Sequence, residues 1–338
     1  MVFVTGATGL VGRYLVCELL KHGDEVRALC RPSSNRQAVI DHAERQGIGT
    51  ERLHWFEGEL EDGMCLEEAM QGCERVYHCA AVVSFHRKDA QKMRQVNRDA
   101  TATLVNAMLH AGVPELVHIS SVAALGRKGD DPVHEDVPFE YGPDATAYAC
   151  SKFEAELEVW RGQEEGLKVL TVNPSIIIGS GDFSKSSSML FTLVHKGLAW
   201  YPTGSNGFVS AGDVAKAARL LAEYRCWGER YILNAENETY QRLMEMMAQG
   251  LNTKAPTWPL RPIFMALAWR LGMVWEWISR RRFPISKESV ANTHSHHRYA
   301  STKLQDALLA KGVIWTYESI QNVVRQGAND FLRMKETN

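Results

Sequence analysis

The sequence lacks any regular spacing of cysteines, although it contains seven of them in 338 residues. Their odd number and scattered positions exclude a disulfide framework and a CxxC metal or redox pair, so we expect a protein of the reducing cytoplasm. An excess of charge of one sign is also missing, since the formal net charge is −2. Neither nucleic acid nor an anionic membrane is therefore expected as a general partner.

Long apolar runs are missing too. The strongest candidate, 262–278, is shorter than the ~20 residues of a membrane span and contains Arg270 and Glu276. With the basic run at 280–282, it leaves peripheral membrane contact through 262–282 as a weaker alternative to a partly buried helix. Because the first apolar strand begins at residue 1, we expect no signal peptide.

Motifs of several enzyme classes are absent. The sequence contains neither the GxSxG turn of many hydrolases nor the GxxxxGK[ST] loop of nucleoside triphosphatases. His294, His296 and His297 lie close together, but no fourth ligand or catalytic carboxylate accompanies them. We therefore expect a polar loop there and no metal site.

The sequence does contain a glycine turn at its beginning. The apolar run 2–5 is followed by Gly6, Gly9 and Gly12, and then by residues 13–20, whose apolar positions recur at helical spacing. Glycine lets the backbone turn tightly and approach a diphosphate, and the N-terminus of the next helix favours negative charge. This order of strand, turn and helix favours dinucleotide binding over an ordinary strand-to-helix turn.

Strands and helices alternate after the glycine turn. Apolar runs predict strands at 25–30, 53–56, 75–79, 115–119 and 167–172. Helical spacing predicts helices at 64–70, 89–111 and 145–165. In the last of these helices, the residues predicted to face the core are Ala149, Phe153, Leu157 and Trp160. This alternation is typical of an α/β protein with a doubly wound parallel sheet, whose ligands bind at the carboxyl ends of the strands.

Beyond residue 180 the alternation fades. The expected elements are a helix from Asp213, a short strand at 230–233, and helices near 239–250, 259–279 and 316–333. We therefore assign 1–178 to a dinucleotide-binding domain, completed by part of 205–235. Residues 179–338 are assigned to a smaller, mainly helical part that binds the substrate.

Tyr148 and Lys152 carry the most specific chemical signal. Residues four apart on a helix are neighbours, so the predicted helix places an ammonium beside a phenol. A free tyrosine, with a pKa of about 10, is a poor base near neutrality. The lysine charge should lower that pKa and make proton exchange feasible. A surface pair is the alternative, and Ser121 at a strand end, Asn97 in the preceding helix and the glycine turn argue against it.

The end of the second strand bears on the choice of cofactor. An acidic side chain at this place bonds the ribose 2′-hydroxyl of NAD. Here the strand ends at Cys30 and Arg31, with no acid. A guanidinium favours a 2′-phosphate, so NADP(H) is expected in preference to NAD(H), although a solvated arginine is an alternative.

These motifs together resemble those of the extended short-chain dehydrogenases/reductases, in their epimerase/dehydratase-like branch. The matching segments are TGATGLVG (5–12), HCAA (78–81), VN (96–97), HISS (118–121), YACSK (148–152), VNPSIIIGSGD (172–182) and FVSAGDVAKA (208–217). They cover about two thirds of the chain in the expected order. The resemblance implies a Rossmann fold and an NAD(P)-dependent enzyme.

The resemblance also implies roles for individual residues. The diphosphate of the cofactor would be held by Gly6, Thr8, Gly9, Leu10, Val11 and Gly12. Arg31 would contact the 2′-phosphate, and the rest of the cofactor would lie against Glu59, Leu60, Ala80, Ala81, Pro174 and Ile177. The catalytic set would be Ser121 for the substrate oxygen, Tyr148 as general acid/base, Lys152 on Tyr148 and the ribose, and Asn97 in a proton relay.

Two observations bear on the branch of the family: where this sequence departs from the dehydratase pattern, and which members its segments resemble. Related dehydratases carry an acid pair after the serine, but residues 122–124 here are Val-Ala-Ala, which argues against dehydration. Segments 26–31 and 80–85 look more like those of dihydroflavonol-4-reductase and 3β-hydroxysteroid-dehydrogenase-like members. This favours reversible hydride transfer between NADP(H) and a carbonyl or secondary alcohol.

Two alternatives remain open. One is a nucleotide-sugar epimerase with tightly held NAD, and the other is a non-catalytic dinucleotide sensor. The tyrosine–lysine pair argues against the sensor. The resemblance further implies a homodimer that pairs the helices at 89–111 and 145–165.

Overall fold

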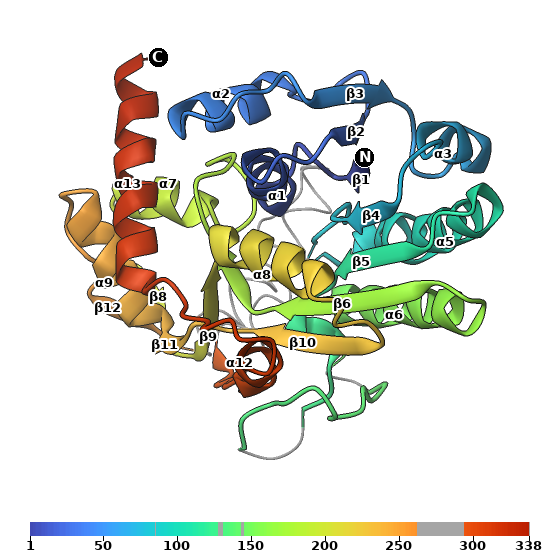
Figure 1. The fold of residues 1–338 in the computed structure, drawn as a ribbon. Helices are drawn as coiled ribbons and strands as arrows, with labels where there is room; N and C mark the ends of the chain where they lie inside the picture. Colours follow the sequence, from blue (N-terminus) through green and yellow to red (C-terminus); the bar gives the residue numbers. More distant parts are fainter. Residues whose placement is uncertain (85, 128–130, 143–144, 262–293, 338) are drawn as a thin grey trace.

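The computed structural model describes residues 1–84, 86–127, 131–142, 145–261 and 294–337. The centre of the fold is a parallel sheet of seven strands in the order β10-β6-β5-β4-β1-β2-β3 (Figure 1). Its strands are β1 (Val2–Thr5), β2 (Val26–Cys30), β3 (Leu53–Glu57), β4 (Arg75–His78), β5 (Glu115–Ile119), β6 (Lys168–Pro174) and β10 (Glu229–Leu233). The predicted doubly wound α/β fold is confirmed.

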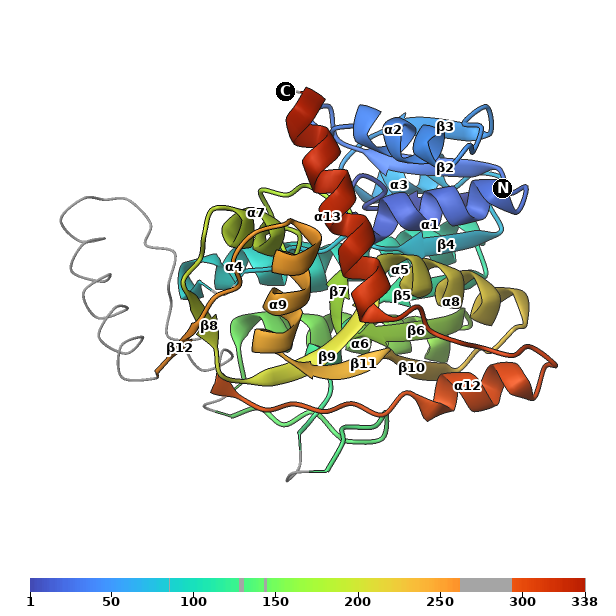
Figure 2. The ribbon, with the colours of Figure 1, turned by 90° about the vertical axis from the view of Figure 1, so that its left-hand side faces the viewer.

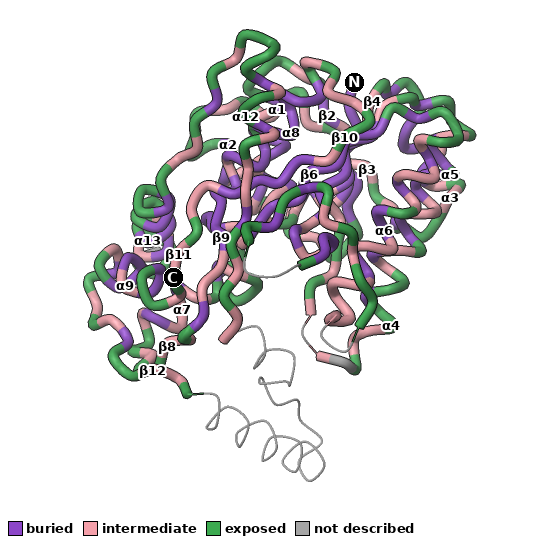
Figure 3. The backbone as a smooth tube through the Cα atoms, turned by 90° about the horizontal axis from the view of Figure 1, so that it is seen from below, coloured by how far each residue is buried: buried purple, intermediate pink, exposed green. Residues whose placement is uncertain are grey.

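Helices cover both faces of this sheet. One face packs against α1 (Leu10–Lys21), α2 (Gln37–Arg45), α8 (Ala211–Glu223) and α12 (Thr302–Leu309). The other packs against α3 (Gly63–Ala69), α5 (Ala100–Ala111) and α6 (Ala147–Glu164). Buried backbone therefore runs through the middle of the molecule, as Figure 3 shows. A sheet covered on both faces can bind ligands only at its strand ends.

The helical run before α5 contains an irregularity that the apolar stripe did not predict. It starts as α4 (Ala90–Met93), widens into a π-helical turn over Arg94–Asp99, and continues as α5. Such turns shift the register of the side chains that follow, and they are frequent at functional sites. The helix ends at Gly112, whose φ of 69° suits the left-handed C-terminal position.

The smaller part combines helices with short strands. A three-stranded sheet has the order β11-β9-β7, from β7 (Ile176–Ile178), β9 (Ser205–Ser210) and β11 (Glu236–Thr239). β8 (Trp200–Pro202) and β12 (Trp258–Leu260) form a second, two-stranded sheet. The helices are α7 (Met189–His195), α9 (Tyr240–Gly250) and α13 (Ile320–Thr337). Figure 2 shows α13 running past α7 and α9, with which it shares a hydrophobic core.

The structure corrects one predicted helix in this part. The helix expected at 259–279 does not begin at 259, because residues 258–260 pair with β8 as a strand. The rest of that prediction, and the proposed contact of 262–282 with a membrane, lie almost wholly outside the described residues. Among the residues that are described, no helix combines the length and the apolar character needed to cross a bilayer.

The orientation of α6 is also corrected. The predicted inward stripe was Ala149, Phe153, Leu157 and Trp160, yet none of these four residues is fully buried. Leu157 is 50% exposed. The stripe that faces the sheet contains Lys152, Glu156 and Val159. Helical periodicity alone favoured the more apolar face, whereas polar partners at the strand ends turn the charged face inward.

Candidate active site

The glycine turn joins β1 to α1 and leaves no space for side chains. Gly6 has a φ of 67°, and a Cβ there would lie 2.6 Å from the backbone nitrogen of Ala80. A Cβ on Gly12 would lie 2.1 Å from the carbonyl oxygen of Gly6. Gly9 closes the turn, since its N–H donates to the Gly6 carbonyl at 2.9 Å. The turn thus holds bare backbone against the end of β4.

The first turn of α1 is available to an anion. Gly9 precedes the helix and supplies no side-chain cap, and no acidic residue lies in the first turn. Arg13 is largely buried and donates to the carbonyls of Thr8 and Gly9, at 3.2 and 3.4 Å. Backbone N–H groups, a helix N-terminus and a nearby guanidinium together fit a diphosphate. A dinucleotide therefore fits the backbone of Gly6 to Gly12.

The carboxyl ends of β1, β4 and β5 meet beside this turn. Thr5, the last residue of β1, accepts from the Ala80 N–H at 3.3 Å and bonds the His78 ring at 2.7 Å. Ala80 is half-buried and Ala81 is exposed after β4. The small side chains at 80 and 81 leave room for a ligand to pass along this edge.

Ser121 and Tyr148 meet at the same edge. Ser121 follows β5, and its Oγ accepts from the Ala123 N–H at 3.2 Å. Thr146 caps α6 by accepting from the Ala149 N–H at 3.1 Å, which places Tyr148 in the first turn. The Tyr148 hydroxyl is hydrogen-bonded to Ser121. The structure thus brings together the two groups that the sequence predicted to flank a substrate oxygen.

Burial changes the acidity of this tyrosine in the direction opposite to our prediction. The pKa of Tyr148 is raised by burial, and the Ser121 hydrogen bond offsets only part of the rise. These two are the causes of the shift, so the Lys152 charge does not lower the pKa of Tyr148 as expected. The phenol is therefore protonated near neutrality, which suits a proton donor.

Lys152 lies one helical turn below Tyr148 and is only 2% exposed. Its Nζ donates to the Ile119 carbonyl at 3.0 Å, which ties α6 to the end of β5. Burial lowers the pKa of Lys152 to about 8, and the charge of Glu156 opposes that change. The ammonium thus has donors left for a ribose hydroxyl near the Tyr148 phenol.

Asn97 lies in the π-helical turn and has a fully engaged side chain. Its amide donates to the Val82 carbonyl and to the Ser151 Oγ, both at 2.9 Å, and its oxygen accepts from the Val82 N–H at 2.7 Å. The side chain therefore fixes the loop after β4 against α6. The predicted relay role remains a prediction.

The adenosine end of the cofactor is expected to bind beyond the ends of β2 and β3. Arg31 is exposed, and its backbone N–H donates to the Ser34 Oγ at 3.0 Å. Arg36 pairs with Glu57 at the same edge. Arg36 escaped the sequence analysis because it follows the strand by six residues and lies in no motif.

The remaining residues predicted to contact the cofactor follow β3 and β6, at the carboxyl edge of the central sheet. Leu60 is buried and Glu59 is exposed after β3. Pro174 is buried at the end of β6, where it pairs with Leu233 of β10. Ile177 is half-buried in β7. The residues predicted for the cofactor thus follow successive strand ends.

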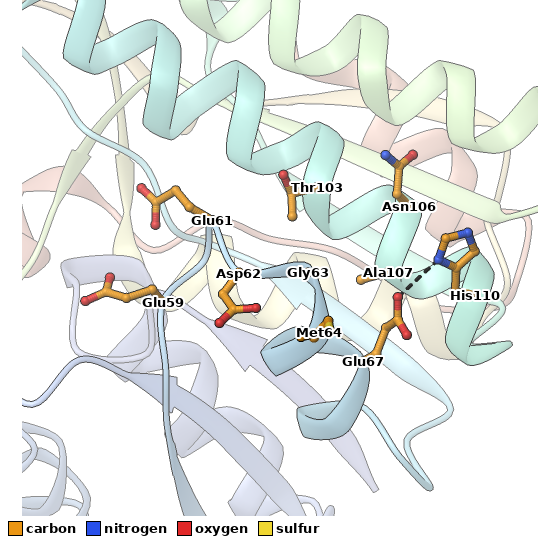
Figure 4. A pocket seen from close by; sticks show the side chains of 10 residues that line it. All are labelled: Glu59, Glu61, Asp62, Gly63, Met64, Glu67, Thr103, Asn106, Ala107 and His110. Atoms are coloured by element: carbon orange, nitrogen blue, oxygen red, sulfur yellow. Dashed lines mark hydrogen bonds and ion pairs between the residues drawn. The ribbon is translucent and has the colours of Figure 1, made fainter.

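A hollow of about 710 Å³ lies between α3 and α5, and of the predicted cofactor contacts only Glu59 lines it (Figure 4). Four carboxylates line it, from Glu59, Glu61, Asp62 and Glu67. Glu67 bonds the His110 ring at 3.1 Å. This concentration of negative charge is unsuited to a phosphate. The glycine turn is therefore the better diphosphate site.

No group of three or more His, Cys, Asp or Glu side chains arranged to hold a metal occurs among the residues the structure describes. His294 and His296 instead bond the hydroxyls of Thr203 and Ser205, at 2.8 and 3.1 Å.

The sequence analysis missed the partners beneath Ser121. Glu156 is fully buried and accepts hydrogen bonds from Ser120 and Asn173. The available signal was spacing, because Glu156 follows Lys152 by four residues, as Lys152 follows Tyr148. The apolar residues of the helix favoured a different inward face, so Glu156 was not predicted to be buried.

Comparisons with known proteins agree with this arrangement. A sequence model of the NAD dependent epimerase/dehydratase family matches residues 2–231. The chain is 32% identical, over 286 residues and 83% of each chain, to sterol demethylase protein B of Methylococcus capsulatus. It is 27% identical to a bifunctional dihydroflavonol 4-reductase/flavanone 4-reductase of Malus domestica, over 73% of this chain and 75% of that one.

A solved structure shares the fold over nearly the whole chain. The dTDP-glucose 4,6-dehydratase DesIV of Streptomyces venezuelae, solved with NAD bound, superposes with a TM-score of 0.78. The match covers 99% of this chain and 98% of that one at 19% identity, so it speaks for the fold alone. The resemblance inferred from the motifs is confirmed by the family match. The chain is an enzyme of the NAD dependent epimerase/dehydratase family, among the extended short-chain dehydrogenases/reductases.

Proposed function

We propose that the protein is an NADP(H)-dependent oxidoreductase that interconverts a carbonyl and a secondary alcohol on a small molecule. The observation that carries this proposal is the Ser121–Tyr148 hydrogen bond, held above the buried Lys152 ammonium at the edge where the glycine turn lies. These groups match the needs of a carbonyl that gains a hydride and a proton.

Each side chain has one task in this reaction. Bound NADP(H) supplies or accepts the hydride at its nicotinamide. The Ser121 hydroxyl donates a hydrogen bond to the substrate oxygen. Tyr148 gives its proton to that oxygen during reduction, and its raised pKa keeps the proton available. Lys152 holds the cofactor ribose beside the phenol, and the Ser121 hydrogen bond stabilises the phenolate that remains.

The residues that follow Ser121 suit a reductase better than a dehydratase. Water elimination needs an acid and a base at the substrate. The turn after Ser121 is formed by Val122–Ala124, which has no titratable side chain. Simple hydride transfer needs no group there.

NADP(H) is proposed over NAD(H) because an arginine, and no acid, follows β2. Arg31 is exposed where an acid would bind the ribose of NAD, and Arg36 lies at the same edge. Arg31→Asp should weaken NADPH binding at least tenfold and leave NADH binding within about twofold. Titrations of the intrinsic fluorescence measure both constants, with Arg325→Asp on the far helix α13 as the control. Equal losses for both cofactors would remove this assignment.

The proposed division of labour follows the sheet. Residues 1–178, with β10 as the last strand, would bind the dinucleotide, and 179–338 would shape the pocket over the nicotinamide. In support, β7 follows β6 directly in the chain and pairs with β9 in the separate three-stranded sheet of the smaller part. Substrate selectivity should then follow substitutions in the smaller part without loss of NADPH affinity.

The test is turnover with a panel of compounds. NADPH oxidation should be followed with cyclic ketones, dihydroflavonols, 3-keto steroids and aldehydes, and Tyr148→Phe should reduce kcat by about 10²–10⁴-fold while retaining NADPH binding. Tyr141→Phe is the matched control, since Tyr141 is exposed and its ring meets Phe153 edge to face. Retained NAD with equilibration of UDP-sugars would instead favour an epimerase. Cofactor binding without any turnover would favour a sensor.

A further inference from the structure

The buried stripe of α6 continues one turn beyond Lys152. Tyr148, Lys152 and Glu156 follow one another at four-residue spacing, so they lie along one side of the helix. Glu156 is 0% exposed, although a carboxylate is almost never fully buried without partners. The proposed reaction assigns it no task.

Two hydrogen-bond donors and one guanidinium contact the Glu156 carboxylate. Its Oε1 accepts from the Ser120 hydroxyl and from the Asn173 amide, the latter at 2.6 Å. Its Oε2 lies 3.4 Å from a guanidinium nitrogen of Arg230 in β10, and Arg230 stacks over Trp160. Each of these partners can donate, so the side chain acts as an acceptor. Burial raises the pKa of Glu156, and the Arg230 charge and the hydrogen bonds from Ser120 and Asn173 oppose that rise.

Two of these contacts lead directly to the serine of the site. Ser120 precedes Ser121 in the chain. The Asn173 amide that bonds Glu156 also donates to the Ser121 backbone carbonyl at 3.0 Å. The Glu156 carboxylate therefore fixes the backbone on which Ser121 stands. Through Ser121 it fixes the partner of the Tyr148 hydroxyl.

Glu156 also supplies negative charge beside Lys152. The titratable groups facing Lys152 or Glu156 are Tyr148 on α6, His78 and Cys79 at the end of β4, His118 on β5 and Arg230 on β10. β6 contributes the uncharged Thr171 and Asn173. Burial raises the pKa of Cys79 to about 12 and lowers the pKa values of both histidines, so these three are neutral near pH 7. Among the described residues of this cluster, Glu156 is thus the one carboxyl group, and its negative charge would face the Lys152 ammonium.

We propose that Glu156 is a positioning residue of the site, acting as the buried counter-charge of Lys152 and as the anchor of the Ser121 backbone. It acts through Lys152 and Ser121 and does not touch the substrate. This inference deepens the proposed function and rests on it for its consequence in turnover. The electrostatic part can be measured in the protein without any substrate.

The direct test is the titration of Lys152. Protein labelled with ¹³C at lysine Cε reports each amine by NMR, and Lys152→Arg identifies the resonance. In the wild type the Lys152 resonance should titrate near pH 8. Glu156→Gln keeps the size of the side chain but removes the charge, so the midpoint should fall by about one pH unit or more.

A matched control lies on the same helix. Glu158 pairs with Arg161 at 2.9 Å and faces away from Lys152, so Glu158→Gln removes a carboxylate from α6 without touching the buried cluster. Its Lys152 midpoint should stay at the wild-type value. Glu156→Asp retains the charge. Its Lys152 midpoint should therefore stay closer to the wild-type value than to that of Glu156→Gln, although the shorter side chain weakens the bond to Asn173.

The turnover readout separates positioning from a purely structural role. In Glu156→Gln, the alkaline fall of kcat/KM for NADPH should move to lower pH together with the Lys152 midpoint. An unchanged midpoint in Glu156→Gln would overturn the proposal. If no variant of residue 156 folds, the titration of Lys152 in the wild type tests the proposal. A Lys152 amine that is neutral at pH 6.5 would also overturn the proposal. A shifted midpoint in a protein that reduces no carbonyl would leave this inference standing and reject the proposed function.

Discussion

Burial acts in opposite directions on the two titratable side chains at the start of α6. It raises the pKa of the Tyr148 phenol and lowers the pKa of the Lys152 ammonium to about 8. Near neutrality both groups therefore carry their protons. This state suits reduction of a carbonyl, in which Tyr148 is the donor.

The pH dependence of the enzyme follows from Lys152. Because burial lowers its pKa, the ammonium is present below about pH 8 and is lost above it. We expect kcat/KM for NADPH, which reports the free enzyme, to be flat below this value and to fall up to tenfold per pH unit above it. Initial rates measured between pH 6 and 10 test this. A fall that begins only near pH 10, as for an ordinary lysine, would contradict the role given to its burial.

Single residues were predicted from the sequence with unequal success. Gly6, Gly9, Ser121 and Tyr148 stand in motifs whose spacing carries their chemistry, and the structure places them along one edge. Arg36, Glu156 and Asn173 act through partners that are distant in the chain, as Asn173 does with Ser121 across 52 residues. Spacing along α6 could place Glu156 beside Lys152, but it holds no signal of the partners on other strands.

At the scale of elements, the glycine turn has the tightest steric requirement. A Cβ on Gly12 would lie 2.1 Å from the Gly6 carbonyl oxygen and 2.8 Å from the Ala7 Cα, and both are backbone atoms. Gly12→Ala must therefore open the turn. We expect a loss of about 1–3 kcal/mol in the free energy of unfolding, together with at least tenfold weaker NADPH binding.

Gly63→Ala is the control for this substitution. Gly63 begins α3, and a Cβ there would make only an ordinary contact, 3.6 Å from the Thr103 methyl. Urea unfolding should show a change within about 0.5 kcal/mol of the wild type. If Gly12→Ala were equally harmless, the turn would not be the close-packed cradle described above.

The strands of the central sheet before residue 180 were predictable because each is a short run rich in apolar residues that alternates with a helical pattern. The short strands of the smaller part were not. β7, β9 and β11 have three to six residues each and are defined by pairing with one another. The inward face of α6 was predicted wrongly for a related reason, since Glu156 and Lys152 are buried by partners on β5, β6 and β10.

At the scale of the whole molecule, the outward face of α6 indicates association. Ala149 and Phe153 are half-buried, and Leu157 is 50% exposed on the same stripe. An apolar stripe on an outer helix suits the homodimer implied by the resemblance, with α5 and α6 of two copies packed together.

Light scattering coupled to size exclusion tests this dimer. The wild type should elute as a dimer at micromolar concentration, and Leu157→Glu should shift it to the monomer because it buries two unpaired charges at the interface. Leu309→Glu, at a leucine that is 62% exposed on α12, should leave the dimer intact. A monomeric wild type would reject the predicted assembly.

The whole account depends on coupling between hydride transfer and the Tyr148 proton. The most direct measurement uses NADPH deuterated at the transferred position of the nicotinamide, with a carbonyl compound from the turnover panel and mass spectrometry of the alcohol formed. We expect one deuterium at the former carbonyl carbon with the wild type and a loss of at least a hundredfold in its rate with Tyr148→Phe. Deuterium transfer at an undiminished rate in Tyr148→Phe, or no transfer to any carbonyl by the wild type, would contradict the account.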